Sequence, residues 1–334
     1  MKAADALLRV RGLHVSYRRP GARWGGRERR VRAVRGVDLE ILRGETLGLV
    51  GESGSGKSTL ARALLRLVAP EAGSVIFDGV RIEAMQGEGL RRFRRRAQMV
   101  FQDPYASLNP RLSAGNALRE VLRVHGLGGV HPDGRVAELL ELVGLSPDHA
   151  GRYPHEFSGG QRQRLGIARA LSVEPDFLIL DEPVSALDVS IQAQIINLLA
   201  DLQERFGLTY LFIAHDLALV ETVGDRVAVM LDGRIVEVAD RAELYEKPLH
   251  PYTKALLGAA PRPDPRARRL RTLPVVETEA GTGPAVEEGC SFYLRCQETR
   301  KDATCRAIAP PLEEREDGHR VACHHPSARD GDGG

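Results

Sequence analysis

Two patterns of apolar residues alternate along the chain and predict its elements. The segments 45–50, 177–180 and 208–214 are short and nearly continuous apolar runs, as expected of parallel strands that are buried on both faces. The apolar residues of 60–68 and 191–202 instead recur at helical spacing. Strands and helices that alternate in this way predict an α/β sheet with helices on its faces.

Other segments predict antiparallel pairs. Residues 7–17 alternate loosely, as in a strand, and a Gly- and Arg-rich stretch at 18–32 follows them as an exposed loop. Asp-Gly dipeptides follow the apolar runs at 75–77 and 227–231, and this dipeptide favours the φ > 0 turns that close hairpins. We therefore expect an antiparallel β subdomain beside the main sheet and a second hairpin at 227–238.

The middle and the end of the chain predict two additions to this α/β core. Apolar positions between about 103 and 167 trace helix faces separated by breaks that contain Gly and Pro, which predicts an inserted helical subdomain. After about residue 240 the pattern weakens, and a stretch rich in Pro and Arg at 261–269 is typical of a linker. We therefore expect a domain of residues 1–240 and a small C-terminal extension of residues 241–334.

Charge and hydropathy narrow the classes of function. The chain has 47 basic and 45 acidic side chains, so it lacks the strong positive field of a nucleic-acid-binding protein. Arginines cluster at 18–32 and 91–96, where we favour solvated surfaces over binding of lipid headgroups or nucleic acid. No apolar run approaches the roughly 18 to 20 residues that cross a bilayer, and residues 1–11 lack the apolar core of a signal peptide. We expect a cytosolic protein that works at a membrane only through partner subunits.

The stretch 51–59 carries the first candidate chemistry, because it fits the pattern G-x-x-x-x-G-K-[ST] between a predicted strand and a predicted helix. Glycines let backbone N–H groups turn around phosphates, and the helix N-terminus adds partial positive charge. Lys57 would reach the β- and γ-phosphates of ATP, and Ser58 would bind Mg²⁺. The candidate ATP-binding residues of this stretch are Gly51, Ser53, Gly54, Ser55, Gly56, Lys57, Ser58 and Thr59.

Two carboxylates end the apolar run at 177–180. Asp181 and Glu182 would lie at the carboxyl edge of the sheet, where α/β proteins bind their ligands. Asp181 would orient Mg²⁺ through water, and Glu182 would be the general base that positions and polarises the attacking water. An apolar run followed by Asp-Glu is weak evidence by itself, since many strands end in acidic turns.

The segment Phe157-Ser158-Gly159-Gly160-Gln161, followed by an Arg-rich helix, resembles the signature of the ABC ATPase family. Phe157 stands where that family usually has leucine and keeps an apolar anchor. The resemblance implies a P-loop NTPase fold and an ATPase that uses Mg²⁺. Further landmarks of the family match here at Tyr17, Gln102, Asp188 and His215.

The resemblance also implies a role for each landmark. Ser158 and Gly160 would act in trans and close on the γ-phosphate that the Lys57 loop of a second subunit holds, so the active unit would be a dimer. Tyr17 would stack on adenine, His215 would hold the γ-phosphate, and Gln102 would link Mg²⁺ to the helical subdomain. Asp188 would lie in the loop that contacts the other subunit.

Two segments make the resemblance more specific. Residues 101–111 and 250–257 look like the ATPases of oligopeptide/dipeptide importers, and residues 289–290 and 319–323 match the C-terminal extension of that group. The resemblance covers nearly the whole chain. It implies an ATPase subunit at the cytoplasmic face of the cell membrane that drives uptake of peptides.

That resemblance implies several partners. They are two transmembrane permease subunits, an extracytoplasmic substrate-binding protein, and a second ATPase subunit. The form of the segment around Gln102 suggests a related subunit, although an identical copy stays open. Nickel complexes and glutathione are alternative cargoes, and a soluble ABC ATPase that acts on nucleic acid or ribosomes is the rival hypothesis.

All four cysteines lie in the last 45 residues, at Cys290, Cys296, Cys305 and Cys323. Disulfides are rare in the cytosol, and the spacing matches no short zinc motif. Some members of the importer family are thought to hold a [4Fe-4S] cluster in this extension. A cluster, a zinc site helped by His319 or His324, and plain reduced thiols remain as three alternatives.

Overall fold

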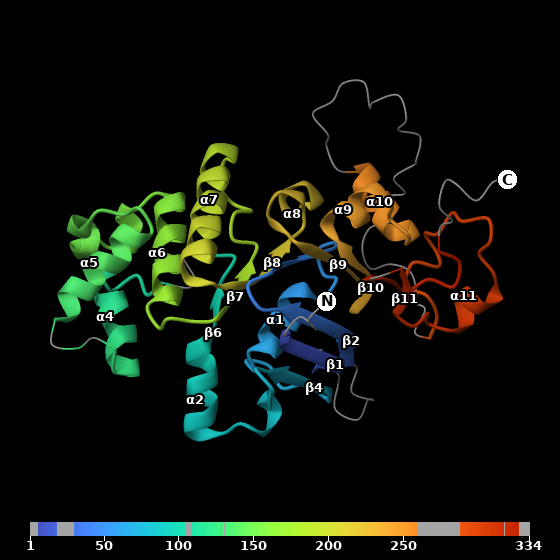
Figure 1. Cartoon of the computed structure of the whole chain (residues 1–334), viewed down its shortest axis with the longest axis horizontal. Helices are drawn as coiled ribbons and strands as arrows, with labels where there is room; N and C mark the ends of the chain where they lie inside the picture. Colours follow the sequence, from blue (N-terminus) through green and yellow to red (C-terminus); the bar gives the residue numbers. More distant parts are fainter. Residues whose placement is uncertain are drawn as a thin grey trace, which may run out of the picture.

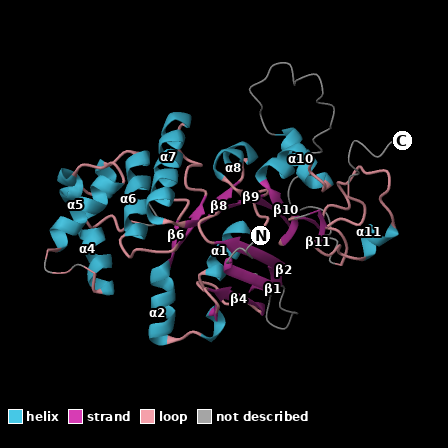
Figure 2. Ribbon diagram, in the orientation of Figure 1, coloured by secondary structure: helices cyan, strands magenta, loops and turns pink. Residues whose placement is uncertain are grey.

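An eight-stranded sheet runs through the centre of the protein (Figures 1 and 2). The computed structural model describes residues 6–18, 30–103, 108–127, 129, 131–259, 288–316 and 318–326. Five neighbouring strands, in the order β9-β3-β8-β7-β6, are parallel, and the sheet continues beyond β9 with antiparallel β10, β12 and β11. The bounds are β3 (Thr46–Val50), β6 (Ala97–Val100), β7 (Phe177–Asp181), β8 (Thr209–Ala214), β9 (Arg226–Leu231), β10 (Arg234–Asp240), β11 (Glu313–Glu316) and β12 (His319–Val321).

The central strands are apolar at consecutive positions because both faces of the sheet are covered. In β7, Leu178 and Leu180 belong to the hydrophobic core on one face, whereas Phe177 and Ile179 belong to the core on the other. All four side chains are at most 1% exposed. Burial of one such side chain stabilises the fold by about 1.5–3 kcal/mol. This packing holds β7 in the middle of the sheet and thereby fixes the position of the carboxylates at its end.

A four-stranded antiparallel sheet, in the order β2-β1-β4-β5, forms the predicted β subdomain. Its strands are β1 (Ala6–Arg18), β2 (Arg30–Leu42), β4 (Ala72–Phe77) and β5 (Val80–Arg81). The predicted loop at 18–32 is wrong at both ends, because Arg18 pairs with Arg30 as the last register position of β1 and β2. The part at 19–29 lies outside the described residues.

The helices fall into groups around the two sheets. Helices α4, α5 and α6 form the predicted helical subdomain, which lies beyond α7 at one end of the molecule, whereas α11 lies at the other end (Figure 1). The bounds are α1 (Lys57–Leu64), α2 (Gly87–Arg96), α4 (Ala114–His125), α5 (Pro132–Leu142), α6 (Gly159–Leu171), α7 (Val189–Phe206), α8 (Leu217–Val223), α9 (Arg241–Glu246), α10 (Pro251–Ala259) and α11 (Ala303–Ala307).

The predicted helix at 60–68 ends earlier in the structure. Helix α1 stops at Leu64, and the N–H groups of Leu67 and Val68 both donate to the carbonyl of Arg62. Arg66 adopts a φ of 52°, and a left-handed residue at this point ends the helix. The helical spacing of apolar residues in the sequence thus continues for about one helical turn past the end of α1.

The residues after 240 are more ordered than their weak pattern predicted. Helices α9 and α10 follow β10 directly, and β12 pairs with β10 and so adds the end of the chain to the main sheet. The fully buried carboxylate of Glu237 accepts from the backbone N–H groups of Leu249 and His250, and His319 Nε2 lies 2.8 Å from Glu237 Oε1. The predicted linker at 261–269 lies outside the described residues. Within the described ranges, no helix combines the length and apolar character that a bilayer crossing requires.

Candidate nucleotide site

The candidate residues meet at one edge of the main sheet because their strands are parallel neighbours. The loop 51–56 follows β3, His215 follows β8, Asp181 ends β7 with Glu182 next to it, and Gln102 follows β6. Since the sheet order is β3-β8-β7-β6, the carboxyl ends of all four strands lie side by side. This is the place where parallel α/β sheets bind ligands.

The loop 51–56 turns tightly between β3 and α1. Gly51 has a φ of 155°, and a Cβ at this position would lie 2.1 Å from the carbonyl oxygen of Met230 in β9. Gly56 has a φ of 106°, and a Cβ at this position would lie 2.2 Å from the backbone carbonyl oxygen of Ala33. Both positions therefore require glycine, and the loop is held against two strands as it enters α1.

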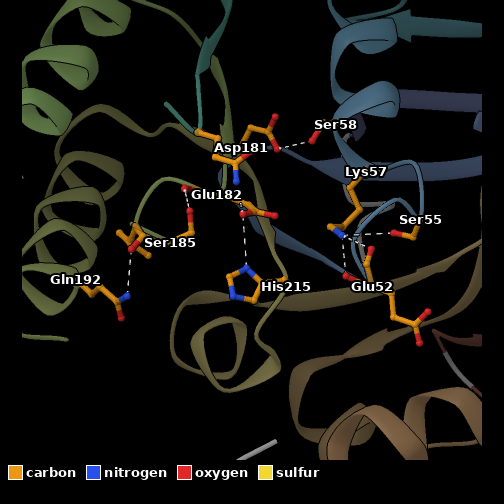
Figure 3. Close-up of polar contacts among 12 residues, drawn as sticks. Glu52, Ser55, Lys57, Ser58, Asp181, Glu182, Ser185, Gln192 and His215 are labelled. Carbon is orange, nitrogen blue, oxygen red and sulfur yellow. Dashed lines mark hydrogen bonds and ion pairs between the residues drawn. The ribbon is translucent and has the colours of Figure 1, made fainter. Parts of the chain in front are cut away.

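Lys57 lies inside this loop (Figure 3). Its ammonium donates to the backbone carbonyls of Gly51 at 2.7 Å and Glu52 at 2.8 Å, and the side chain is buried. Burial lowers the pKa of Lys57, and the carboxylates of Glu182, Asp181 and Glu52 act in the opposite direction. A buried cation that is held by neutral oxygen acceptors can exchange them for phosphate oxygens, which bind it more strongly because they carry charge.

Ser58, the first residue after Lys57, faces the end of β7. Its hydroxyl donates to Asp181 Oδ1 at 3.0 Å (Figure 3). Burial raises the pKa of Asp181, and the hydrogen bond from Ser58 acts against this effect. A hydroxyl and a buried carboxylate at this distance are oxygen ligands of the kind that Mg²⁺ takes beside phosphates, so the pair fits this ion.

The carboxylate of Glu182, just after β7, contacts residues that follow two neighbouring strands. Gln102 Nε2 donates to Glu182 Oε2 at 2.8 Å, and His215 Nδ1 lies 3.5 Å from the same oxygen. Glu182 has a φ of 47°, and its own N–H donates to the carbonyl of Ile213 in β8. A non-glycine residue in this conformation is strained, and such strain is commonly found at functional sites. In Figure 3 the carboxylate of Glu182 extends toward the side on which Lys57 lies.

The turn after Glu182 is braced by side chains. Ser185 Oγ donates to the Glu182 carbonyl at 3.2 Å (Figure 3), and Gln192 Nε2 donates to the carbonyls of Val184 and Leu187. Asp188 caps α7 by accepting from the N–H of Ile191. The predicted subunit-contact loop is therefore a rigid turn that begins at the candidate base.

The Ser158 segment forms a second group at the start of α6. Ser158 caps the helix, and its hydrogen bonds with Gln161 close a capping box. A Cβ on Gly160 would lie 2.5 Å from Ile191 in α7, and one on Gly159 would lie 3.3 Å from Leu187. This segment therefore packs on Leu187 of the turn and on the start of α7, and the hydroxyl of Ser158 is engaged in its own helix cap.

The remaining predicted residues lie around the loop or at its border. Ser55 is buried and accepts weakly from Lys57 at 3.4 Å, whereas Ser53, Gly54 and Thr59 belong to the same loop and helix start. Tyr17 lies near the end of β1, opposite Val31 of β2, and its side chain is 38% exposed. A partly exposed ring at the border of the β subdomain is free to stack on a planar ligand.

The four cysteines line one cavity in the C-terminal extension and are not joined by disulfides. Burial raises the pKa of Cys290 and Cys305, and raises that of Cys323 to about 11, and in each case neighbouring cysteines add to the effect. Among the described His, Cys, Asp and Glu side chains, the three whose ligand atoms lie within 4.8 Å of one another are Asp302, Cys305 and His325. No three of the four thiols are that close. A single tetrahedral zinc with four thiolates, at about 2.3 Å each, would need them closer.

The two histidines that were candidates for this cavity differ in position. His324 lines it and has its Nε2 3.0 Å from the carbonyl of Ile308. His319 is not among the lining residues and is instead bound to Glu237 in the core. The hypothesis of a zinc site helped by His319 is therefore wrong for this structure.

Comparison with known families decides the class of this site. Residues 34–185 match the family model described as ABC transporter, and residues 236–305 match the model described as oligopeptide/dipeptide transporter, C-terminal region. YkfD of Bacillus subtilis is 50% identical over 301 residues, which are 90% of this chain and 91% of that protein. The chain belongs to the ABC transporter family of ATP-binding proteins. This ABC ATPase is also 49% identical over 296 residues to the oligopeptide transport ATP-binding protein AppF of Bacillus subtilis, covering 88% of this chain and 89% of AppF.

Solved structures confirm the fold of the ABC ATPase. It is similar to cbiO1 from Clostridium perfringens, part of the transporter complex cbiONQ, with a TM-score of 0.62 at 28% identity over 73% of this chain and 92% of that one. It is similar to the same degree to the ATP-binding cassette MJ0796, solved as a dimer in a post-hydrolysis state with ADP and phosphate, over 70% of this chain and 98% of that one. The prediction of an α/β P-loop NTPase with ATPase activity is confirmed.

Two residues at the ABC ATPase site were not predicted as site residues. The hydroxyl of Tyr252 accepts from the N–H of Glu52 at 3.0 Å, and Arg295 Nη1 lies 2.7 Å from Glu52 Oε1. The contacts join residues that are 200 and 243 positions apart. Tyr252 lies in the stretch 250–257 that resembles importer ATPases, but nothing in that stretch links it to the phosphate loop, and no motif marks Arg295. Each acts through a contact that the fold creates.

Proposed function

We propose that this ABC ATPase hydrolyses ATP to drive an importer of oligopeptides or dipeptides at the cytoplasmic face of the cell membrane. The match of residues 236–305 to the oligopeptide/dipeptide C-terminal region carries the proposal, since this region follows an ATPase core that many other transporters share. AppF, which is named for oligopeptide transport, supports it. Two permease subunits, an extracytoplasmic substrate-binding protein and a second ATPase subunit complete the proposed machine.

In the proposed mechanism, the loop 51–59 and the start of α1 hold the β- and γ-phosphates with backbone N–H groups and with the Lys57 ammonium. Ser58 and Asp181 would hold Mg²⁺, which neutralises charge on the phosphate oxygens. Glu182 accepts a proton from the water that attacks the γ-phosphorus in line, and the bond to the ADP oxygen breaks. Gln102 and His215, both beside Glu182 Oε2, keep that carboxylate and the γ-phosphate in position.

The second half of the site comes from another subunit in this proposal. Ser158, Gly159, Gly160 and Gln161 would close on the γ-phosphate bound by the partner, and Asp188 would line the contact. The packing of Gly160 on α7 and of Gly159 on Leu187 couples this segment to the turn that begins at Glu182. Dimer closure would therefore move both half-sites together, with Tyr17 stacked on adenine.

The four cysteines are proposed to hold a [4Fe-4S] cluster. Four thiols that line one cavity, with no three of them within 4.8 Å of one another, favour a group wider than a single ion. Raised thiol pKa values mean that reduced and empty thiols would be neutral, whereas bound iron would favour the thiolate form. The cluster would be structural, because its cavity lies in the extension.

The function is tested with Glu182→Gln in cells that lack the natural gene. Loss of the base is expected to lower ATPase turnover by about 10²- to 10⁴-fold while ATP binding persists, and to abolish uptake of a labelled tripeptide. Glu204→Gln, an exposed carboxylate of α7, is the matched control and should keep both activities. Normal turnover of Glu182→Gln would refute the assigned base.

Other results would contradict the proposed cargo or the proposed location. Uptake of nickel or glutathione in place of the tripeptide would replace the proposed cargo. A protein that stays in the supernatant when membranes sediment, and whose ATPase is stimulated by nucleic acid, would refute the transport proposal altogether.

A further inference from the structure

Glu52 is held by the C-terminal part of the chain at two of its groups. Its backbone N–H donates to the hydroxyl of Tyr252 at 3.0 Å, and its carboxylate forms an ion pair with Arg295 at 2.7 Å. Its backbone carbonyl accepts from Lys57. In Figure 3 the carboxylate of Glu52 points away from the Lys57 ammonium. The second residue of the phosphate loop is therefore tied to residues far outside the ATPase motifs.

The two partners of Glu52 pack on each other. The guanidinium of Arg295 lies over the ring of Tyr252 at 5.7 Å and over the ring of Phe292 at 5.2 Å. The rings of Tyr252 and Phe292 are 5.5 Å apart, and Tyr252 is 1% exposed. Such stacking fixes the orientation of the planar guanidinium, so the side chain loses less conformational entropy when it binds a carboxylate. Tyr252 and Arg295 thus form one preformed clamp.

The clamp is continuous with the cysteine cavity. Arg295 directly precedes Cys296, in a turn where the N–H groups of Arg295 and Cys296 both donate to the carbonyl of Phe292. Phe292 also lines the cavity of the four cysteines, and the N–H of Cys290 donates to the carbonyl of Cys305. The position of the clamp therefore depends on the fold of the cysteine segment.

We propose that Tyr252 and Arg295 are positioning residues of the nucleotide site, through which the C-terminal extension holds the phosphate loop in its binding conformation. The inference rests on the proposed role of loop 51–59. Tyr252 fixes the peptide between Gly51 and Glu52. Arg295 neutralises a carboxylate of the phosphate loop that would otherwise be unpaired and would add negative charge to a loop that binds an anion. Without the clamp, the loop would be less well ordered and more negative.

The test measures MgADP binding to the full chain by calorimetry. Tyr252→Phe, which removes only the hydroxyl, is expected to raise Kd about 3- to 10-fold. Arg295→Met is expected to raise Kd about 2- to 5-fold, since the ion pair is partly exposed. Both variants should raise the KM for ATP more than they change kcat, because neither residue touches the reacting atoms. A fall in kcat with no change in the KM for ATP, in both variants, would overturn a positioning role.

Matched controls separate this role from general stability. Tyr210→Phe also removes a buried hydroxyl hydrogen bond, to the carbonyl of Leu199, and Arg306→Met removes an exposed arginine of the same extension. Both should bind MgADP as the wild type does. If Tyr252→Phe and Arg295→Met bind as these controls do, the inference fails.

A double variant tests the charge argument directly. In a Glu52→Gln background there is no carboxylate to neutralise, so Arg295→Met should then change Kd by less than about 1.5-fold. An undiminished effect would overturn the assigned contact. Arg295→Lys, with an intermediate effect expected, replaces Arg295→Met if that variant does not fold. Lys57→Ala distinguishes the two proposals. If Lys57→Ala binds nucleotide normally, the proposed role of loop 51–59 is refuted. If Lys57→Ala loses nucleotide binding while Tyr252→Phe binds normally, only the clamp is refuted.

Discussion

Gly51→Ala offers a sharp test of how the phosphate loop is held. The added Cβ would lie 2.1 Å from the carbonyl oxygen of Met230 and 3.0 Å from Ser55 Oγ, whereas ordinary contact begins at 3.4 Å. Met230 belongs to β9, whose backbone is paired on both sides by β3 and β10 and cannot retreat. The loop must therefore move by more than 1 Å at Gly51.

A displacement of about 1 Å in a site that places reacting groups costs on the order of 10²-fold. We therefore expect the Kd for MgADP to rise about 100-fold in Gly51→Ala, which corresponds to about 2.7 kcal/mol. The free energy of unfolding should also fall, by about 1–3 kcal/mol, as in other overpacked interiors. Calorimetry measures the first quantity and urea unfolding the second.

Gly44→Ala is the matched control for this substitution. Gly44 has a φ of 75° and would find no atom within 4 Å of an added Cβ, so alanine there meets only backbone strain of about 1–2 kcal/mol. Its Kd for MgADP should stay within about 2-fold of the wild type. If folded Gly51→Ala binds nucleotide as well as Gly44→Ala does, contact with β9 does not position the loop and the reasoning is refuted.

Two further predictions concern the C-terminal extension. Burial lowers the pKa of His250 to about 4, and its Nδ1 accepts from the N–H of Tyr252, so the folded state favours neutral His250. The stability that this preference gives is fully present above the unfolded pKa of 6.5 and is lost as pH falls toward 4. Between pH 7.5 and 5, the free energy of unfolding should therefore drop by about 2 kcal/mol more in the wild type than in His250→Gln. An equal drop in both proteins would contradict this prediction. Iron and acid-labile sulfide should both be found in anaerobically purified protein and be lost in Cys290→Ser; zinc alone, or neither metal, would exclude the cluster.

Local patterns in the sequence determined most of the α/β core. Continuous apolar runs marked β3, β7 and β8 because strands that are buried on both faces need apolar side chains at every position. The loop 51–59 was recognisable because only glycine allows its turns and because its chemistry is contained in nine consecutive residues. The ATPase class followed from such short stretches, because the residue types that each one needs are adjacent in the sequence.

Helix ends and irregular segments were less predictable. The pattern at 60–68 continued past Leu64, where the left-handed conformation of Arg66 turns the backbone, and apolar spacing contains no information on that dihedral. Helices α9 and α10 were missed because they are short: they span six and nine residues, and α9 buries only Leu244, so neither shows a long amphipathic pattern.

Only the tertiary structure decided which residues act together. Parallel pairing of β3, β8, β7 and β6 brings Ser58 to Asp181 and Gln102 to Glu182, across 123 and 80 positions of the chain. The same holds for the cysteines, which converge on one cavity although their spacing matches no short motif. The clamp on Glu52 was not predicted, although Tyr252 lies in the stretch 250–257 that resembles importer ATPases. Tyr252 and Arg295 reach the phosphate loop because α10 and the cysteine segment fold back against it, and such a contact depends on the packing of the whole chain.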